Sequence, residues 1–124
     1  MNVKKLKESI EVLKNNLDGA LMACDIWKDG TGTSIAGYNT NPQATALFDR
    51  VTDYMNKSLK TSGFPSLDKY YLLELKNNAL IVVLQFEQGY QWGMLVDNSK
   101  VNLGLLLNIA IPEARKAFIE AIGD

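Results

Sequence analysis

The beginning of the chain has the hydrophobic pattern of an amphipathic helix. Apolar side chains recur at alternating intervals of three and four residues, and lysine and glutamate occupy many of the positions between them. The apolar stripe consists of Val3, Leu6, Ile10, Leu13 and Leu17. This spacing places the stripe on one face of a helix. The Asp18-Gly19 pair that follows predicts the helix end.

An extended hairpin is predicted next. Residues 20–27 read as a strand, Asp29-Gly30 as its turn, and residues 33–38 as a partner strand that returns antiparallel. A second helix follows, because Asn41 can cap it and Pro42 suits its first position. Its wide apolar stripe consists of Ala44, Leu47, Phe48, Val51, Tyr54, Met55 and Leu59. Gly63 and Pro65 then predict its end.

The period changes from helical to extended at Leu67. Three strands, residues 67–76, 79–87 and 90–96, are separated by the turn signals Asn77-Asn78 and Gln88-Gly89, so they form a meander. Residues 79–84 are apolar at every position. A strand of this kind has both faces covered, which predicts helices on either side of the sheet.

The last predicted element is a helix over residues 101–122. Asn98 or Ser99 could cap it, and Pro112 would kink or split it. The predicted order is therefore helix, two strands, helix, three strands, helix.

Composition restricts the class of protein. The 124 residues, 47% of them hydrophobic and 22% charged, fit one globular domain over residues 1–124. Thirteen basic and 14 acidic side chains give a net charge of −1, which argues against a nucleic-acid-binding or anionic-membrane surface. Histidine is absent, which excludes histidine relays and imidazole metal ligands. No apolar run approaches the roughly 20 residues that span a bilayer, and no signal peptide is visible, so we expect a cytoplasmic protein without membrane insertion.

The candidate chemical groups do not form a catalytic set. Cys24 has no basic neighbour in sequence, which favours a small buried hydrophobic side chain over a nucleophile. Strand alternation places Asp25 either at a margin of the core, the interpretation we favour, or as a partnered buried carboxylate. The glycine-rich stretch at Gly30 lacks the lysine of a phosphate-binding loop. We therefore expect no enzyme, no metal and no cofactor.

Two tryptophans leave a further alternative open. Trp27 and Trp92 belong to the first and last predicted strands, and such aromatic side chains either pack in the core or line a ligand pocket. The pocket interpretation predicts a profilin-like or sensor-type domain that binds a small molecule near both side chains.

The order of elements, together with three local stretches, resembles the Roadblock family of dynein light chains and small-GTPase regulators. These stretches are Asp18-Gly19-Ala20, Asp29-Gly30 followed by residues 34–38, and residues 102–106. The resemblance covers nearly the whole chain. It implies an α+β fold in which five antiparallel strands form a single sheet, with the middle helix on one face and the terminal helices on the other.

The resemblance also implies a homodimer or heterodimer in which the middle helices, here residues 42–61, pack together and the third strands, here residues 67–76, pair edge to edge. Residues 70–73 are unusually apolar for an exposed edge, which is compatible with such pairing. The alternative is that Tyr71, Leu73 and Leu75 fill one face of an ordinary core while Tyr70 and Leu72 face a helix. The candidate dimer contacts are Tyr70, Tyr71, Leu72, Leu73, Tyr54 and Leu47.

A partner protein is the remaining implication of the resemblance. The family uses the joined sheet and helices as a platform for a Ras-like small GTPase or a larger assembly. On the middle helix, Arg50, Asp53 and Lys57 form a charged stripe that is either solvated or a partner-binding surface. Arg50 and Arg115, the two arginines, lie in no projecting predicted loop, so the sequence predicts no arginine finger.

Overall fold

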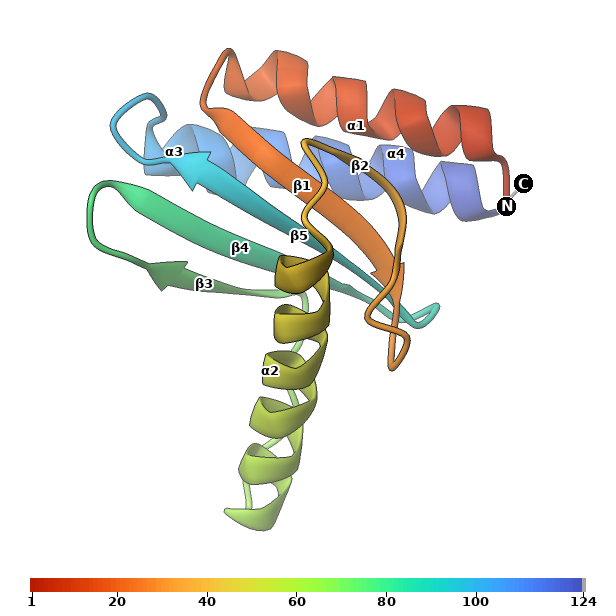
Figure 1. The fold of residues 1–124 in the computed structure, drawn as a ribbon, viewed down its shortest axis with the longest axis vertical. Helices are drawn as coiled ribbons and strands as arrows, with labels where there is room; N and C mark the ends of the chain where they lie inside the picture. Colours follow the sequence, from red (N-terminus) through yellow and green to blue (C-terminus); the bar gives the residue numbers. More distant parts are fainter. Residues whose placement is uncertain (124) are drawn as a thin grey trace.

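One antiparallel sheet of five strands organises residues 1–123, the part of the chain that the computed structural model describes (Figure 1). The strands lie in the order β2-β1-β5-β4-β3, so β3 forms one edge and β2 the other. The elements are α1 (Val3–Leu17), β1 (Leu21–Lys28), β2 (Ser34–Tyr38), α2 (Pro42–Thr61), β3 (Tyr70–Glu74), β4 (Ala79–Phe86), β5 (Tyr90–Asp97), α3 (Leu103–Leu105), a π-helical segment (Leu106–Ala110) and α4 (Ile111–Gly123). The predicted α+β fold and element order are confirmed.

Local sequence signals set the element boundaries. The α1 helix ends where Asp18 adopts a left-handed conformation (φ 42°) and its amide donates to the Lys14 carbonyl. Asn77 and Asn78 both have positive φ, 63° and 59°, which is the backbone of a type I′ hairpin turn and suits asparagine. This turn joins β3 to β4.

The main core lies between the sheet and the pair formed by α1 and α4, which run side by side over one face (Figure 1). Trp92 and Phe118 are fully buried there, and their rings meet edge to face with centroids 6.1 Å apart. Tight packing of this kind makes the α1/α4 face the rigid side of the molecule.

The opposite face carries a smaller cluster under α2. Trp27, Tyr71, Ile81 and Val83 form its buried centre, and Phe48 and Met55 of α2 pack against it. Only Thr45 and Thr52 of α2 are fully buried. Figure 1 shows the C-terminal part of α2 extending beyond the end of the sheet. Helices on both faces were predicted correctly, but α2 covers its face only in part.

Two predicted boundaries were wrong. The third strand covers Tyr70–Glu74 and is therefore shorter than residues 67–76. The Leu67 amide donates to Asn56 Oδ1 on α2, and the Leu75 amide donates to the Ala79 carbonyl where the hairpin turn begins. The last helix begins at Leu103, where Asn102, rather than Asn98 or Ser99, caps it by accepting from the amides of Gly104 and Leu105.

Pro112 neither ends the last helix nor divides it into separate helices. The helix continues as α4, and the π-helical segment ends at Ala110, two residues before the proline. Proline lacks an amide hydrogen and its ring crowds the carbonyl four residues earlier, so the wider turn accommodates it within a continuous helix.

Candidate functional site

The N-terminus of α2 is fastened to β1 through Asp25. Asn41 caps α2 by accepting hydrogen bonds from the amides of Gln43 and Ala44, and its own amide donates to Asp25 Oδ2 (3.2 Å). Asp25 is only 6% exposed, so the favoured position at the margin was wrong and the alternative of a partnered buried carboxylate is correct. Its second oxygen, Oδ1, is buried without a hydrogen-bond partner.

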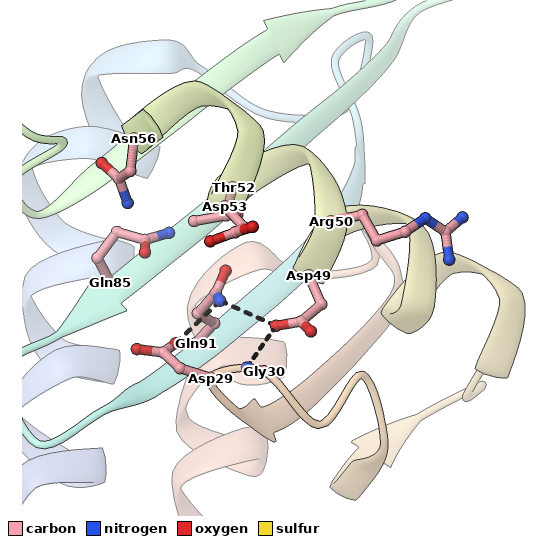
Figure 2. A pocket seen from close by; sticks show the side chains of 9 residues that line it. All are labelled: Asp29, Gly30, Asp49, Arg50, Thr52, Asp53, Asn56, Gln85 and Gln91. Atoms are coloured by element: carbon pink, nitrogen blue, oxygen red, sulfur yellow. Dashed lines mark hydrogen bonds between the residues drawn. The ribbon is translucent and has the colours of Figure 1, made fainter. Parts of the chain in front are cut away.

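A second attachment lies two turns further along α2. Asp49 Oδ1 accepts hydrogen bonds from Trp27 Nε1 (3.1 Å), the Gly30 amide (3.0 Å) and, at a longer distance, Gln91 Nε2 (3.4 Å). Gln91 Nε2 also donates to Asp29 Oδ1 (2.9 Å), as Figure 2 shows. One carboxylate therefore joins α2 to β1, the hairpin turn and β5.

The sequence did not single out Asp49. Its neighbours Arg50 and Asp53 drew attention as a charged stripe, whereas Asp49 points to the sheet. The available signal was the spacing of Thr45, Asp49 and Thr52, which places three polar residues on one helix face. Thr52 completes this row with a 2.8 Å hydrogen bond to the Tyr71 hydroxyl. Polar contacts thus hold α2 where the apolar cluster is small.

A polar cleft of about 340 Å³ opens between α2 and the ends of β4 and β5. It is lined by Asp29, Gly30, Asp49, Arg50, Thr52, Asp53, Asn56, Gln85 and Gln91 (Figure 2). Within the described residues, no group of three side chains of the metal-ligating types is placed to hold a metal ion.

The six candidate dimer contacts divide into two sets. Tyr54 and Leu47 are exposed on α2, at 73% and 45%, and Tyr70 is 40% exposed on β3. Leu72 and Leu73 are half-buried, and Tyr71 is buried in the α2 cluster. Among the described residues β3 pairs only with β4, which leaves its outer edge open. The role of these residues in a dimer stays a prediction.

The charged stripe lies on the solvent side of α2. Lys57 Nζ is 2.9 Å from Asp53 Oδ2, and this hydrogen bond raises the pKa of Lys57. Both side chains are exposed, and Figure 2 shows the Arg50 guanidinium pointing away from the cleft. The three residues lie along one exposed part of the helix, and their role in binding a partner also stays a prediction.

The two tryptophans do not share a pocket. Trp92 belongs to the core under α1 and α4, whereas Trp27 belongs to the cluster under α2. The register explains this, because Trp92 pairs with Ile26 and not with Trp27. Both indoles are almost completely buried. A single ligand pocket lined by both side chains, as the small-molecule alternative required, is excluded by this arrangement.

Cys24 lies in the main core and is 2% exposed. Burial raises the pKa of its thiol to about 11, although contacts with Trp92 and the Tyr38 backbone act in the opposite direction. The thiol is therefore protonated at neutral pH, in agreement with the prediction of a buried hydrophobic side chain.

No family model and no curated protein matches the chain. Solved structures do match it. MglB of Myxococcus xanthus has a TM-score of 0.75 at 13% identity, covering 96% of this chain and 91% of that one. A structure described as MglB with tetrameric arrangement has a TM-score of 0.69 at 12% identity, covering 94% and 92%. A Roadblock/LC7 domain from Streptomyces avermitilis has a TM-score of 0.63 at 8% identity, covering 92% and 94%.

These similarities extend over nearly the full length of both chains in each comparison. The fold is therefore the Roadblock fold, and the resemblance inferred from the sequence is confirmed at the level of fold. None of the helices in residues 1–123 is both long enough and apolar enough to cross a membrane.

Proposed function

We propose that this chain is a non-enzymatic regulatory or scaffolding module that forms a dimer and binds a Ras-like small GTPase or a larger protein assembly. The observation that carries the proposal is the unequal covering of the sheet. Helices α1 and α4 cover one face of the sheet, whereas α2 covers the other face only in part and exposes Tyr54 and Leu47. The outer edge of β3 has no partner strand within the described residues. Exposed apolar side chains and an unpaired strand edge are each typical of protein-binding surfaces.

The absence of catalysis is part of the proposal and is supported by what the polar groups do. Asp25 is engaged in fastening α2, and the Cys24 thiol stays protonated at neutral pH. Asp49, with three hydrogen-bond donors on one oxygen, holds the helix to the sheet. The hydrogen bonds of Asp25 and Asp49 therefore have a structural role, which supports a scaffold rather than a catalytic site.

Dimerisation has two sources of support. The tetrameric arrangement named for one MglB structure indicates that this fold can assemble with itself. In the present chain, Tyr54 and Leu47 are exposed on α2 and the outer edge of β3 has no partner strand among the described residues, so both surfaces are free to pair with a second copy. We further propose that residues 1–124 act as one domain in the cytoplasm.

The test is affinity capture from a lysate of the source cell, carried out in parallel with a non-hydrolysable GTP analogue and with GDP, and analysed by mass spectrometry. We expect a small GTPase retained preferentially in one nucleotide state, because switch loops differ in structure between the two states. The variant Arg50→Glu should reduce retention, whereas Lys116→Glu on α4 is the matched control, since it also reverses one exposed cation. Absence of any GTPase in both states would contradict GTPase binding.

A further inference from the structure

The polar cleft beside α2 contains hydrogen-bonding atoms that the protein does not use. Gln91 is only 3% exposed, and its Oε1 is buried without a partner; Gln85 Nε2 is likewise buried without one. The two residues are paired across β4 and β5, so both amides lie on the α2 side of the sheet. Figure 2 shows both amides directed toward the space beneath Thr52 and Asp53.

The orientation of the Gln91 amide is fixed. Its Nε2 donates to Asp29 and Asp49, which leaves Oε1 facing the cleft as an acceptor. The backbone of Gln85 is also held, because its carbonyl accepts from Arg115 (2.9 Å) and its amide donates to the Lys69 carbonyl (2.8 Å). A buried acceptor without a hydrogen-bond donor is energetically unfavourable. A bound group that supplies N–H donors would therefore satisfy Gln91 Oε1 at the floor of the cleft.

The charges around the cleft favour a cation. Asp29, Asp49 and Asp53 line it, while the guanidinium of Arg50 points away. Lys57 neutralises part of the Asp53 charge in an exposed ion pair at the rim. The Gln85 amide can turn its oxygen toward a donor, because its nitrogen has no hydrogen bond to lose.

We propose that this cleft binds the guanidinium group of an arginine side chain presented by the partner protein. A guanidinium carries five N–H donors in one plane, which suits acceptors that come from the β1–β2 turn at Asp29, from β5 and from α2. It is also more weakly hydrated than an ammonium, so it loses less hydration free energy on entering the cleft. The volume of about 340 Å³ has room for the group and part of its aliphatic stem. The choice of a protein arginine rests on the proposed function, but the cleft can be tested without any partner.

The test is an NMR titration of the isotopically labelled chain with ethylguanidinium chloride at constant ionic strength. The chain has two tryptophans, and only Trp27 donates to Asp49 at the cleft, whereas Trp92 lies on the opposite face of the sheet. We expect saturable shifts of the Trp27 indole N–H and of the Gln91 side-chain amide, with the Trp92 indole unchanged. N-ethylurea, which is neutral, and ethylammonium should produce much weaker binding.

Two variants make the charge requirement testable. Asp53→Asn removes an exposed carboxylate paired with a lysine on its own helix, and Glu11→Gln does the same on α1, far from the cleft. We expect the first to raise the apparent Kd by about fivefold and the second to leave it unchanged. The proposal is overturned if ethylguanidinium gives no saturable shift, if N-ethylurea binds equally well, or if Asp53→Asn binds as the unmodified chain does. These outcomes do not depend on whether a GTPase is captured.

Discussion

The indole of Trp27 and the carboxylate of Asp49 form a 3.1 Å hydrogen bond that joins β1 to α2. The same carboxylate oxygen also accepts from the Gly30 amide at 3.0 Å. Trp27 is 1% exposed, so its N–H has no alternative partner in solvent when Asp49 is removed. Helix, strand and hairpin turn therefore share one acceptor, and the position of α2 depends on it.

Replacing Asp49 with alanine should destabilise the fold by about 2–3 kcal/mol, because it leaves a buried indole N–H unpaired and removes hydrogen bonds to a charged group. Urea denaturation followed by tryptophan fluorescence measures the loss. Asp53→Ala, one turn further along α2, removes an exposed carboxylate and should cost less than about 1 kcal/mol. Equal losses in the two variants would contradict the anchoring role of Asp49.

If the chain forms a dimer through α2 and the edge of β3, a charge introduced on either surface should halve the molecular mass measured in solution. Tyr54→Lys places a cation on α2 and Tyr70→Lys places one on β3, at side chains that are 73% and 40% exposed. Because neither residue is buried in the monomer, both variants should stay folded, and the free energy of unfolding of the monomer should change by less than about 0.5 kcal/mol. Light scattering coupled to size-exclusion chromatography gives the mass.

Glu120→Lys on α4 is the control for this experiment, since it adds a cation on the closed side of the sheet and should leave the mass unchanged. Tyr71 is unsuitable for a charge because it is 8% exposed and bonded to Thr52, so lysine there would unfold the protein. A monomeric unmodified chain, or dimers that persist in both tyrosine variants, would contradict the proposed interface.

The sequence predicted the elements well because helical and extended periods are local. The α2 start at Asn41-Pro42 and the hairpin turn at Asn77-Asn78 are examples in which a few neighbouring residues determine the backbone. The site was less predictable, because Asp49 takes its partners from β1, the hairpin turn and β5.

Strand register is the second quantity that the sequence could not provide. The prediction could not tell that Trp92 lies opposite Ile26, so it could not assign Trp27 and Trp92 to different faces. A shift of one residue moves a side chain to the other face of the sheet. Asp25 was misjudged for a related reason, because the Asn41 amide that partners it follows the entire hairpin.

Cys24 should make the fold less stable at alkaline pH. Burial raises the pKa of the thiol from its ordinary value of 9.0 to about 11 in the folded state, so between these values the unfolded chain has lost the proton that the folded chain keeps. Stability therefore falls as the pH rises through this window, by about 3 kcal/mol for the full shift. Urea denaturation at pH 8 and pH 10.5 tests this. In Cys24→Ala the decline should be smaller, and an equal decline in both proteins would exclude the thiol as its cause.

Gly37 should tolerate no side chain. It pairs with Asp25 across β1 and β2, and a Cβ at this position would lie 2.7 Å from Thr40 Cγ2 and 2.8 Å from Asp25 Oδ1. Asp25 holds the amide of the α2 cap, so displacing its carboxylate would disturb both the sheet edge and the start of the helix. We expect Gly37→Ala to destabilise the protein by about 2–3 kcal/mol, the upper part of the range for overpacking a rigid site.

Gly123→Ala is the matched control for Gly37→Ala. Gly123 is a helical glycine with open space around its Cβ position, so alanine there should be neutral or slightly stabilising. Thermal unfolding of the two variants separates crowding from a general effect of removing glycine. A melting temperature of Gly37→Ala equal to that of the unmodified chain would mean that the β1–β2 pair and Asp25 can move apart. In that case the fastening of α2 through Asp25 would be adjustable rather than rigid.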